Sequence, residues 1–133
     1  MVEFTNNFTE TDGRRLRSED TKQRIVTAML ELVREGKIAP TAEDVAQRAN
    51  VGLRTVFRRF KDMESLYTEM SVAISAQIAP IVDEQLHHSE WWQNLEQLLA
   101  RRLRVYEIIM PYRIAAGALR FHSTALLNRH LDI

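Results

Sequence analysis

The sequence predicts an all-α protein. Three observations carry this prediction: apolar residues recur at intervals of three and four, no segment alternates apolar and polar residues as a strand does, and caps or breakers separate the periodic segments. The 133 residues allow one compact domain or two small helical ones. A hydrophobic share of 45% with 27% charged residues is typical of a folded globular chain.

The composition excludes several classes of protein. There is no cysteine, which excludes disulfides, thiolate zinc sites and a cysteine nucleophile. No apolar stretch approaches the ~18 residues that a membrane span needs. The first residues, MVEFTNNFTE, lack the basic-then-apolar order of a secretory signal. We therefore expect a cytoplasmic protein with no membrane partner.

The formal net charge of zero conceals two basic segments. Residues 51–61 hold four basic side chains and no acidic one, and residues 13–24 hold five basic against two acidic. Because binding responds to the potential at one face more than to the sum over the chain, the neutral total does not exclude nucleic acid.

The N-terminal part predicts an arm followed by a helix. Residues 1–17 are polar and without periodicity, and we expect a flexible basic arm carrying Arg14, Arg15 and Arg17. Ser18 is the expected helix cap, with acidic residues in the first turn after it. Gly36 is the expected stop. The buried stripe between them is Ile25, Met29, Leu32 and Val33.

Two short helices are expected next. Thr41, with Asp44 three residues later, is a weaker form of the capping box. The helix that follows has a narrow apolar face of small residues, Val45, Ala46 and Ala49. A break at residues 50–52 precedes a third helix, whose apolar positions are Val56, Phe57 and Phe60. Two short helices around a tight turn with glycine, after a longer first helix, predict a helix-turn-helix.

The remaining chain predicts longer helices. One runs from about Asp62 to Ala79 and is ended or kinked by Pro80. Residues 87–89 form a connection with Ser89 as the next cap, before a long amphipathic helix that stops near Pro111. A sixth helix from Ile114 and a fragment of a seventh over residues 124–131 follow. The expected stripes are Leu66, Met70, Ile74 and Ile78, then Trp92, Leu95, Leu99, Leu103, Tyr106 and Met110.

One segment carries a resemblance to a known family. Its residues are Ile25 to Leu32, Gly36, Thr41, Asp44, Val45, Ala46, Ala49, Val51, Gly52, Thr55, Val56, Phe57, Phe60, Lys61, Asp62, Met63, Glu64 and Leu66. In this order and spacing, residues 21–69 resemble the DNA-binding domain of the TetR family of transcriptional repressors. The resemblance implies a DNA-binding domain over residues 18–66 and a ligand-binding and dimerisation region over residues 67–133, incomplete where the chain ends.

The third helix is the expected reading element. Val56 and Phe60 lie four apart and should point inward, so that the helix places its other face in the major groove. Arginine can hold a guanine bidentately and threonine can contact a base edge, whereas other basic side chains contact phosphates. We expect DNA contacts from Thr41, Gly52, Leu53, Arg54, Thr55, Phe57, Arg58, Arg59 and Lys61, with Arg14, Arg15 and Arg17 entering an adjacent minor groove.

Two positions depart from the family pattern. The family usually has Tyr where Phe57 stands and Lys where Met63 stands, and both changes remove a phosphate-binding group. Phe57 therefore has a second interpretation, as a core residue. The arginines of residues 1–17 have one too, as a tail that contacts no groove.

The second half carries no catalytic motif. There is no glycine-rich phosphate loop, nucleophile elbow or HExxH pattern, and the adjacent His87 and His88 have no carboxylate four residues later. We expect no enzymatic activity, no cofactor and no metal. Its aromatic and sulfur side chains are either a ligand pocket or helix-packing core; they are Trp91, Trp92, Tyr106, Met110, Tyr112, Phe121 and His122.

Two functions remain open from the sequence. The first is a sequence-specific regulator, a ligand-responsive repressor that binds a palindromic operator in double-stranded DNA as a homodimer and is released by a small-molecule inducer. The alternative is a helical ligand-binding or protein-binding module that has kept the fold and lost DNA binding. The departures at Phe57 and Met63 and the neutral net charge favour the alternative.

Overall fold

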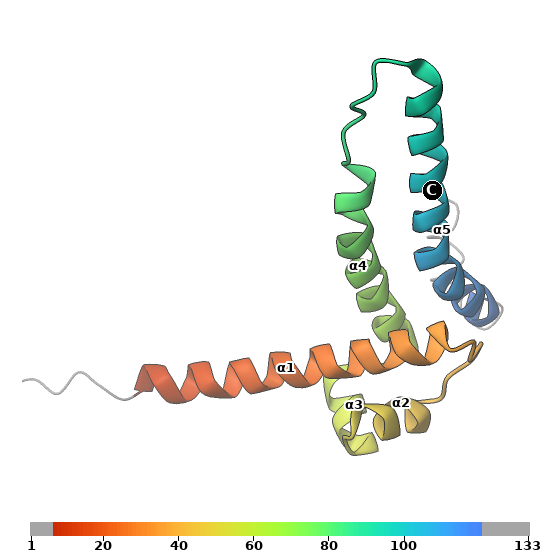
Figure 1. Cartoon of the computed structure of the whole chain (residues 1–133). Coiled ribbons are helices and arrows are strands. Elements are labelled where there is room, and N and C mark those ends of the chain that lie inside the picture. The colour runs from red at the N-terminus through yellow and green to blue at the C-terminus, as the bar shows by residue number, and fades with distance from the viewer. Residues whose placement is uncertain (1–6, 121–133) are drawn as a thin grey trace, which may run out of the picture.

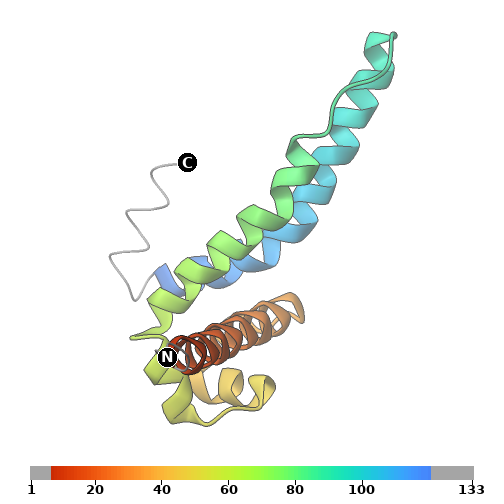
Figure 2. The same ribbon diagram turned by 90° about the vertical axis from the view of Figure 1, so that its left-hand side faces the viewer.

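The computed structural model describes residues 7–120, and this part of the chain is all-α. Helices α4 (Met63–Val82) and α5 (Trp91–Arg120) form an upright antiparallel pair, and α1 (Asn7–Arg34) crosses beneath them (Figure 1). The two short helices α2 (Ala42–Ala49) and α3 (Leu53–Arg59) pack under α1, as the view along α1 in Figure 2 also shows. Within the described residues, no helix is long and apolar enough to cross a membrane.

Helix α1 begins earlier than the sequence predicts. It is continuous from Asn7 to Arg34, so the prediction of a flexible arm is wrong for residues 7–17, and residues 1–6 lie outside the described part. Ser18, the expected cap, is in the helix interior. This segment has no apolar stripe, and a helix that projects beyond the other described helices does not need one. The predicted stop is confirmed: Gly36 has a φ of 96°, the left-handed region that suits glycine.

The core lies where α1 meets the other helices. The predicted stripe of α1 is buried throughout, and the α4 stripe is buried at Leu66, Met70 and Ile74 and half-buried at Ile78. Tyr67 of α4 and Ala115 of α5 are also part of this core. The packing of α1 against both α4 and α5 fixes the small helices relative to the long pair.

The start of α2 matches the predicted capping box. Thr41 N donates to Asp44 Oδ2 at 2.9 Å, and Asp44 N donates to Thr41 Oγ1 at 3.2 Å. The predicted apolar face of α2 is buried. Helix α2 ends at Ala49, and its C-cap Asn50 adopts the left-handed region at a φ of 55°, a conformation that asparagine tolerates better than most residues.

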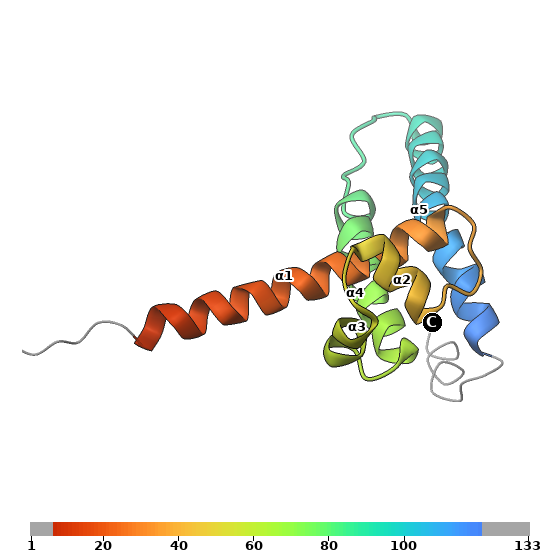
Figure 3. The ribbon, with the colours of Figure 1, turned by 90° about the horizontal axis from the view of Figure 1, so that it is seen from below.

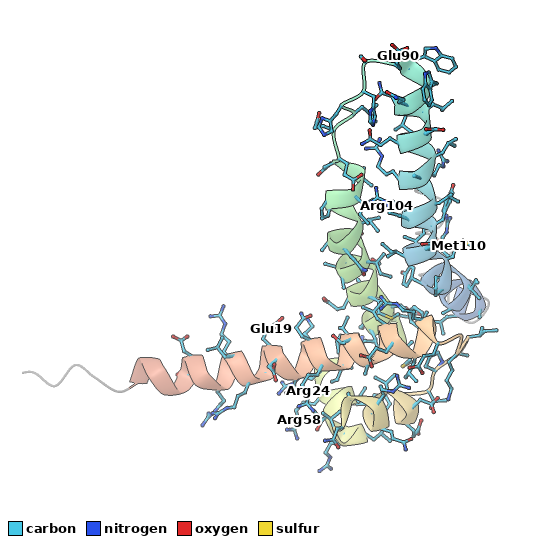
Figure 4. All side chains as sticks on the ribbon, in the orientation of Figure 1. Glu19, Arg24, Arg58, Glu90, Arg104 and Met110 are labelled. Atoms are coloured by element: carbon cyan, nitrogen blue, oxygen red, sulfur yellow. The ribbon has the colours of Figure 1, made fainter. Side chains whose placement is uncertain are left out.

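Two of the three prolines, Pro80 and Pro111, lie inside helices. Helix α4 runs past Pro80 to Val82, so the predicted end at Ala79 is wrong. Helix α5 likewise runs past Pro111 to Arg120, and the described part of the predicted sixth helix belongs to it. Each proline removes only one backbone donor, and a helix can bend to accommodate it. In Figure 4 α5 bends just after the labelled Met110. The predicted seventh helix lies outside the described residues.

The connection over residues 87–89 is confirmed, but its cap is shifted. Helix α5 starts at Trp91, so Glu90 occupies the capping position instead of Ser89, and Asn94 N donates to Glu90 O.

Helix α4 has a side-chain cap at its start: Asp62 accepts from Ser65 N at 2.8 Å. Because α4 spans residues 63–82, it runs through the predicted boundary at residue 66.

Candidate nucleic-acid interface

Helix α3 has one buried face and one exposed face. Val56 and Phe60 are 2% and 3% exposed and belong to the core, as their spacing predicts. On the opposite side Arg54, Phe57 and Arg58 are exposed. At 100° per residue these three side chains lie within about 100° of one another around the helix. They therefore form a single surface, with the other half of α3 fixed in the core.

Phe57 is a surface residue. Its side chain is 53% exposed, which contradicts the interpretation of Phe57 as a core residue. An exposed aromatic ring beside two exposed arginines offers an apolar face to a partner. Leu53, the first residue of α3, is also exposed at 39% and adds to the same apolar component.

The basic side chains on and beside this surface differ in whether they form ion pairs with other described residues. Arg54 and Arg58 have no ion pair among the described residues, and neither does Lys61 just after the helix. Arg59 is half-buried, and its Nε is buried without a hydrogen-bond partner in the described part of the chain. Arg48 of α2 is by contrast fully engaged. Its guanidinium donates to both carboxylate oxygens of Glu35, at 2.6 and 2.7 Å.

The turn before α3 exposes its backbone. Gly52 is the N-cap of α3 and exposed, and a Cβ there would meet only Thr55 Oγ1, at 3.9 Å. Thr55 is half-buried, and its backbone nitrogen donates to Gly52 O. Thr41, at the start of α2, is exposed, but its hydroxyl already accepts the bond from Asp44 N. Thr41 and Gly52 are thus both accessible, each at the N-cap of a short helix.

The arginines expected on an arm stand on a helix instead. Arg14, Arg15 and Arg17 are all exposed on the N-terminal half of α1. This half projects past the other described helices, as Figure 1 and the view from below in Figure 3 both show. As parts of one helix the three side chains point in different directions, so they do not act as one flexible cluster.

Sequence reasoning did not include Arg24 among the site residues. Its Nη2 donates to Ala49 O at 2.7 Å, a bond that joins α1 to the last residue of α2 next to the turn. Figure 4 shows Arg24 and Arg58 on the same side of α1, and Glu19 on the opposite side. The signal that would have found it is its position seven residues after Arg17, which matters only when residues 7–34 are recognised as one helix.

The predicted ligand residues of the second half do not converge. Tyr106 lines an open groove of about 530 Å³ between the ends of α4 and α5, whereas Met110 lines another of about 420 Å³ between α5 and the end of α1. Trp91 and Trp92 are exposed at the start of α5. Tyr112 is half-buried and packs on the core. Phe121 and His122 lie outside the described residues.

The long stripe of α5 faces outward. All six side chains predicted for it are exposed, from Tyr106 at 39% to Leu103 at 64%, and Ile114 continues it. At 1.5 Å per residue, the stretch from Trp92 to Ile114 is about 33 Å long. Among the described aromatic and sulfur side chains of the second half, Tyr112 packs against the core. The side chains of the exposed stripe do not.

Comparisons with protein families, with curated proteins and with solved structures gave no match. The described residues also contain no group of three or more His, Asp or Glu side chains arranged to hold a metal ion.

Proposed function

We propose that the protein is a sequence-specific DNA-binding regulator that reads the major groove with α3. One observation carries the proposal: Arg54 and Arg58 stand exposed on one face of a short helix while Val56 and Phe60 fix its other face in the core. A reading helix needs this division, because its base contacts must be held in register by the rest of the domain. The resemblance of residues 21–69 to TetR-family repressors supports the same function.

The exposed groups divide by their chemistry. The guanidinium groups of Arg54 and Arg58 can each hold the O6 and N7 atoms of a guanine, and the ring of Phe57 can contact a thymine methyl. Lys61, the accessible Gly52 backbone and Thr41 are suited to phosphates, which position a protein without reading its sequence. Phe57 replaces a hydroxyl-bearing residue of the family, so in this chain it contributes apolar contact instead of a phosphate bond.

A regulator of this kind acts as a symmetric pair. Two reading helices must lie about 34–36 Å apart to enter successive major grooves of a palindromic site. The exposed α5 stripe supports pairing, since monomers rarely leave large contiguous apolar surfaces open to water. A homodimer would bury it.

The proposed regulation acts through α4. This helix follows α3 after a short link and packs on α5, so a small inducer bound in the second half can move it and change the spacing of the two reading helices. The protein would then dissociate from its operator when the inducer binds, as a ligand-responsive repressor does. An inducer that binds without changing operator affinity would contradict this switch.

The test is a selection of random duplex DNA on the purified chain, followed by binding of the enriched duplex to Arg54→Ala and Arg58→Ala. Each substitution is expected to cost about 1–3 kcal/mol and to relax specificity at particular base pairs. Arg48→Ala is the matched control, because Arg48 is committed to Glu35. An equal loss across all sequences would make Arg54 and Arg58 phosphate contacts, and no loss would contradict the proposal.

The second candidate is a helical interaction module without DNA binding. The exposed α5 stripe favours it directly, because that surface fits a protein or apolar partner whether or not α3 reads DNA. The two candidates differ in salt dependence: only the DNA-binding regulator loses affinity for DNA steeply as salt rises.

A further inference from the structure

The N-terminal half of α1 extends the molecule on the side of the candidate interface. From Arg24 back to Asn7 the helix spans about 25 Å at 1.5 Å per residue. In Figures 1 and 3 the first part of this stretch projects beyond the other described helices, whereas its end reaches them through Lys22 and Arg24. Its three arginines are exposed, and so is Leu16, at 69%. None of these exposed side chains belongs to the hydrophobic core of the described residues.

The helix repeat assigns Arg17 to the side of the α2–α3 turn. Arg17 and Arg24 are seven residues apart, which places them within about 20° of each other around the helix. Arg24 reaches Ala49 O at the end of α2. The side chain of Arg17 therefore leaves α1 on the same side as Arg24, the side of the turn between α2 and α3. It does so two helical turns closer to the N-terminus.

The same repeat assigns Arg15 to a different side. Arg15 lies seven residues before Lys22, whose Nζ pairs with Glu69 of α4 at 3.3 Å. Arg15 thus shares the face of Lys22, which turns toward α4 and toward Phe60 at the end of α3, and it lies about 160° around the helix from Arg17. Two neighbouring arginines on one exposed helix consequently serve as a test residue and its control.

We propose that Arg17 binds the phosphate backbone of duplex DNA next to the segment read by α3, as part of a rigid helix. The inference rests on the proposed function and adds to it a contact outside the reading helix. An α-helix with its side chains is about 10–12 Å across and does not enter a minor groove about 6 Å wide, so α1 would lie over the sugar–phosphate backbone, where the phosphates are the first groups within reach of Arg17. Arg17 lies about 10 Å along α1 from Arg24, which corresponds to about three base pairs.

The first experiment measures the salt dependence of binding to the enriched duplex for Arg17→Ala and Arg15→Ala. Loss of one phosphate contact lowers the salt slope by about 0.9, so the affinity lost between 50 and 200 mM salt becomes about 3.5-fold smaller. We expect this change for Arg17→Ala and a wild-type slope for Arg15→Ala. Equal slopes in wild type and Arg17→Ala, or equal effects of the two substitutions, would overturn the inference.

The second experiment locates the contact and tests the rigidity of the helix. Shortening the duplex by its flanking base pairs should abolish the difference between wild type and Arg17→Ala. Ser18→Pro bends or breaks α1 at Arg17, which displaces Arg17 from the face of Arg24 while leaving the core stripe of α1 intact, and should reproduce the Arg17→Ala slope. A wild-type slope in Ser18→Pro would overturn the rigid helix.

The outcomes separate this inference from the function on which it rests. A wild-type chain that selects a duplex and binds it with a steep salt slope upholds the regulator, and the Arg17 and Ser18 variants then decide the inference alone. A wild-type chain with no selective binding overturns the proposed function, and the contact from Arg17 fails with it.

Discussion

The hydroxyl of Tyr112 donates to the backbone oxygen of Tyr67 at 3.4 Å, and the two rings lie 6.2 Å apart between centroids. This contact joins α5, one residue after Pro111, to the buried part of α4. Because α4 leads directly from the link after α3, the pair connects the candidate interface to the second half of the molecule. It is one of the contacts through which a change in α5 would reach α4.

Removing the hydroxyl should weaken this junction without opening the core. Tyr112→Phe keeps the ring and loses one long hydrogen bond, so we expect a loss of about 0.5–1 kcal/mol in the free energy of unfolding. Tyr112→Ala also removes ring packing and should cost more. Denaturant unfolding measures both, and equal values for the two variants would contradict the packing role of the ring.

Alkaline pH should destabilise the fold through Tyr67. Burial, and secondarily Tyr112, raises the pKa of Tyr67 from 10 to about 12. The neutral form is therefore favoured in the folded state, so its contribution is complete below pH 10 and is lost as pH rises toward 12. Unfolding measured across this range should show a smaller decline for Tyr67→Phe than for wild type. The same decline in both would contradict this origin.

Two phenylalanines on one short segment should behave in opposite ways. Phe60→Ala removes a ring that is 3% exposed and should cost about 3–5 kcal/mol of stability. Phe57→Ala removes a ring that is 53% exposed and should change stability by no more than about 0.5 kcal/mol while lowering affinity for the selected duplex. Unfolding and DNA titration check the pair. A large loss of stability in Phe57→Ala would contradict its position on the surface and indicate that the ring packs in the core.

Acid should weaken the start of α2. Hydrogen bonds from Thr41 and Lys37 lower the pKa of Asp44 from 3.8 to about 2. Since the folded state favours the charged form, its stabilising effect is present above about pH 4 and is lost as pH falls toward 2. The difference in stability between wild type and Asp44→Asn should therefore shrink over this range. A constant difference would show that the carboxylate charge does not support the cap.

The α5 stripe should govern self-association. Leu103→Glu places a charge in the middle of the exposed stripe and should shift a homodimer toward monomer in sedimentation experiments, because a charge buried in an apolar interface is costly. Val72→Glu is the matched control, since Val72 is similarly exposed but belongs to α4. An equal shift in both variants would remove the stripe from the interface.

Local signals in the sequence were sufficient for the short helices. The capping pair at Thr41, the stop at Gly36 and the inward pair Val56 and Phe60 all follow from interactions within a few residues, and the structure confirms them. Local chemistry also explains the division of α3 into two faces. The exposure of Arg54, Phe57 and Arg58 could therefore be predicted from the sequence, whereas the partial burial of Thr55 and Arg59 could not.

The long helices depend on information that periodicity does not hold. A proline sets a preference for ending a helix, yet Pro80 and Pro111 are both tolerated within helices of 20 and 30 residues. Apolar spacing showed which α5 side chains share a face but not what that face meets. The start of α1 could not be predicted from periodicity, because a polar helix that projects from the rest of the described structure has no apolar stripe.

The salt dependence of wild-type binding to a selected duplex tests the central claim most directly. If α3 and its surroundings bind DNA, the selection yields an inverted repeat, and the logarithm of affinity falls linearly with the logarithm of salt by about 0.9 for each phosphate contacted. Weak retention without an enriched sequence, and with a flat salt dependence, would contradict the DNA-binding account and favour the helical interaction module.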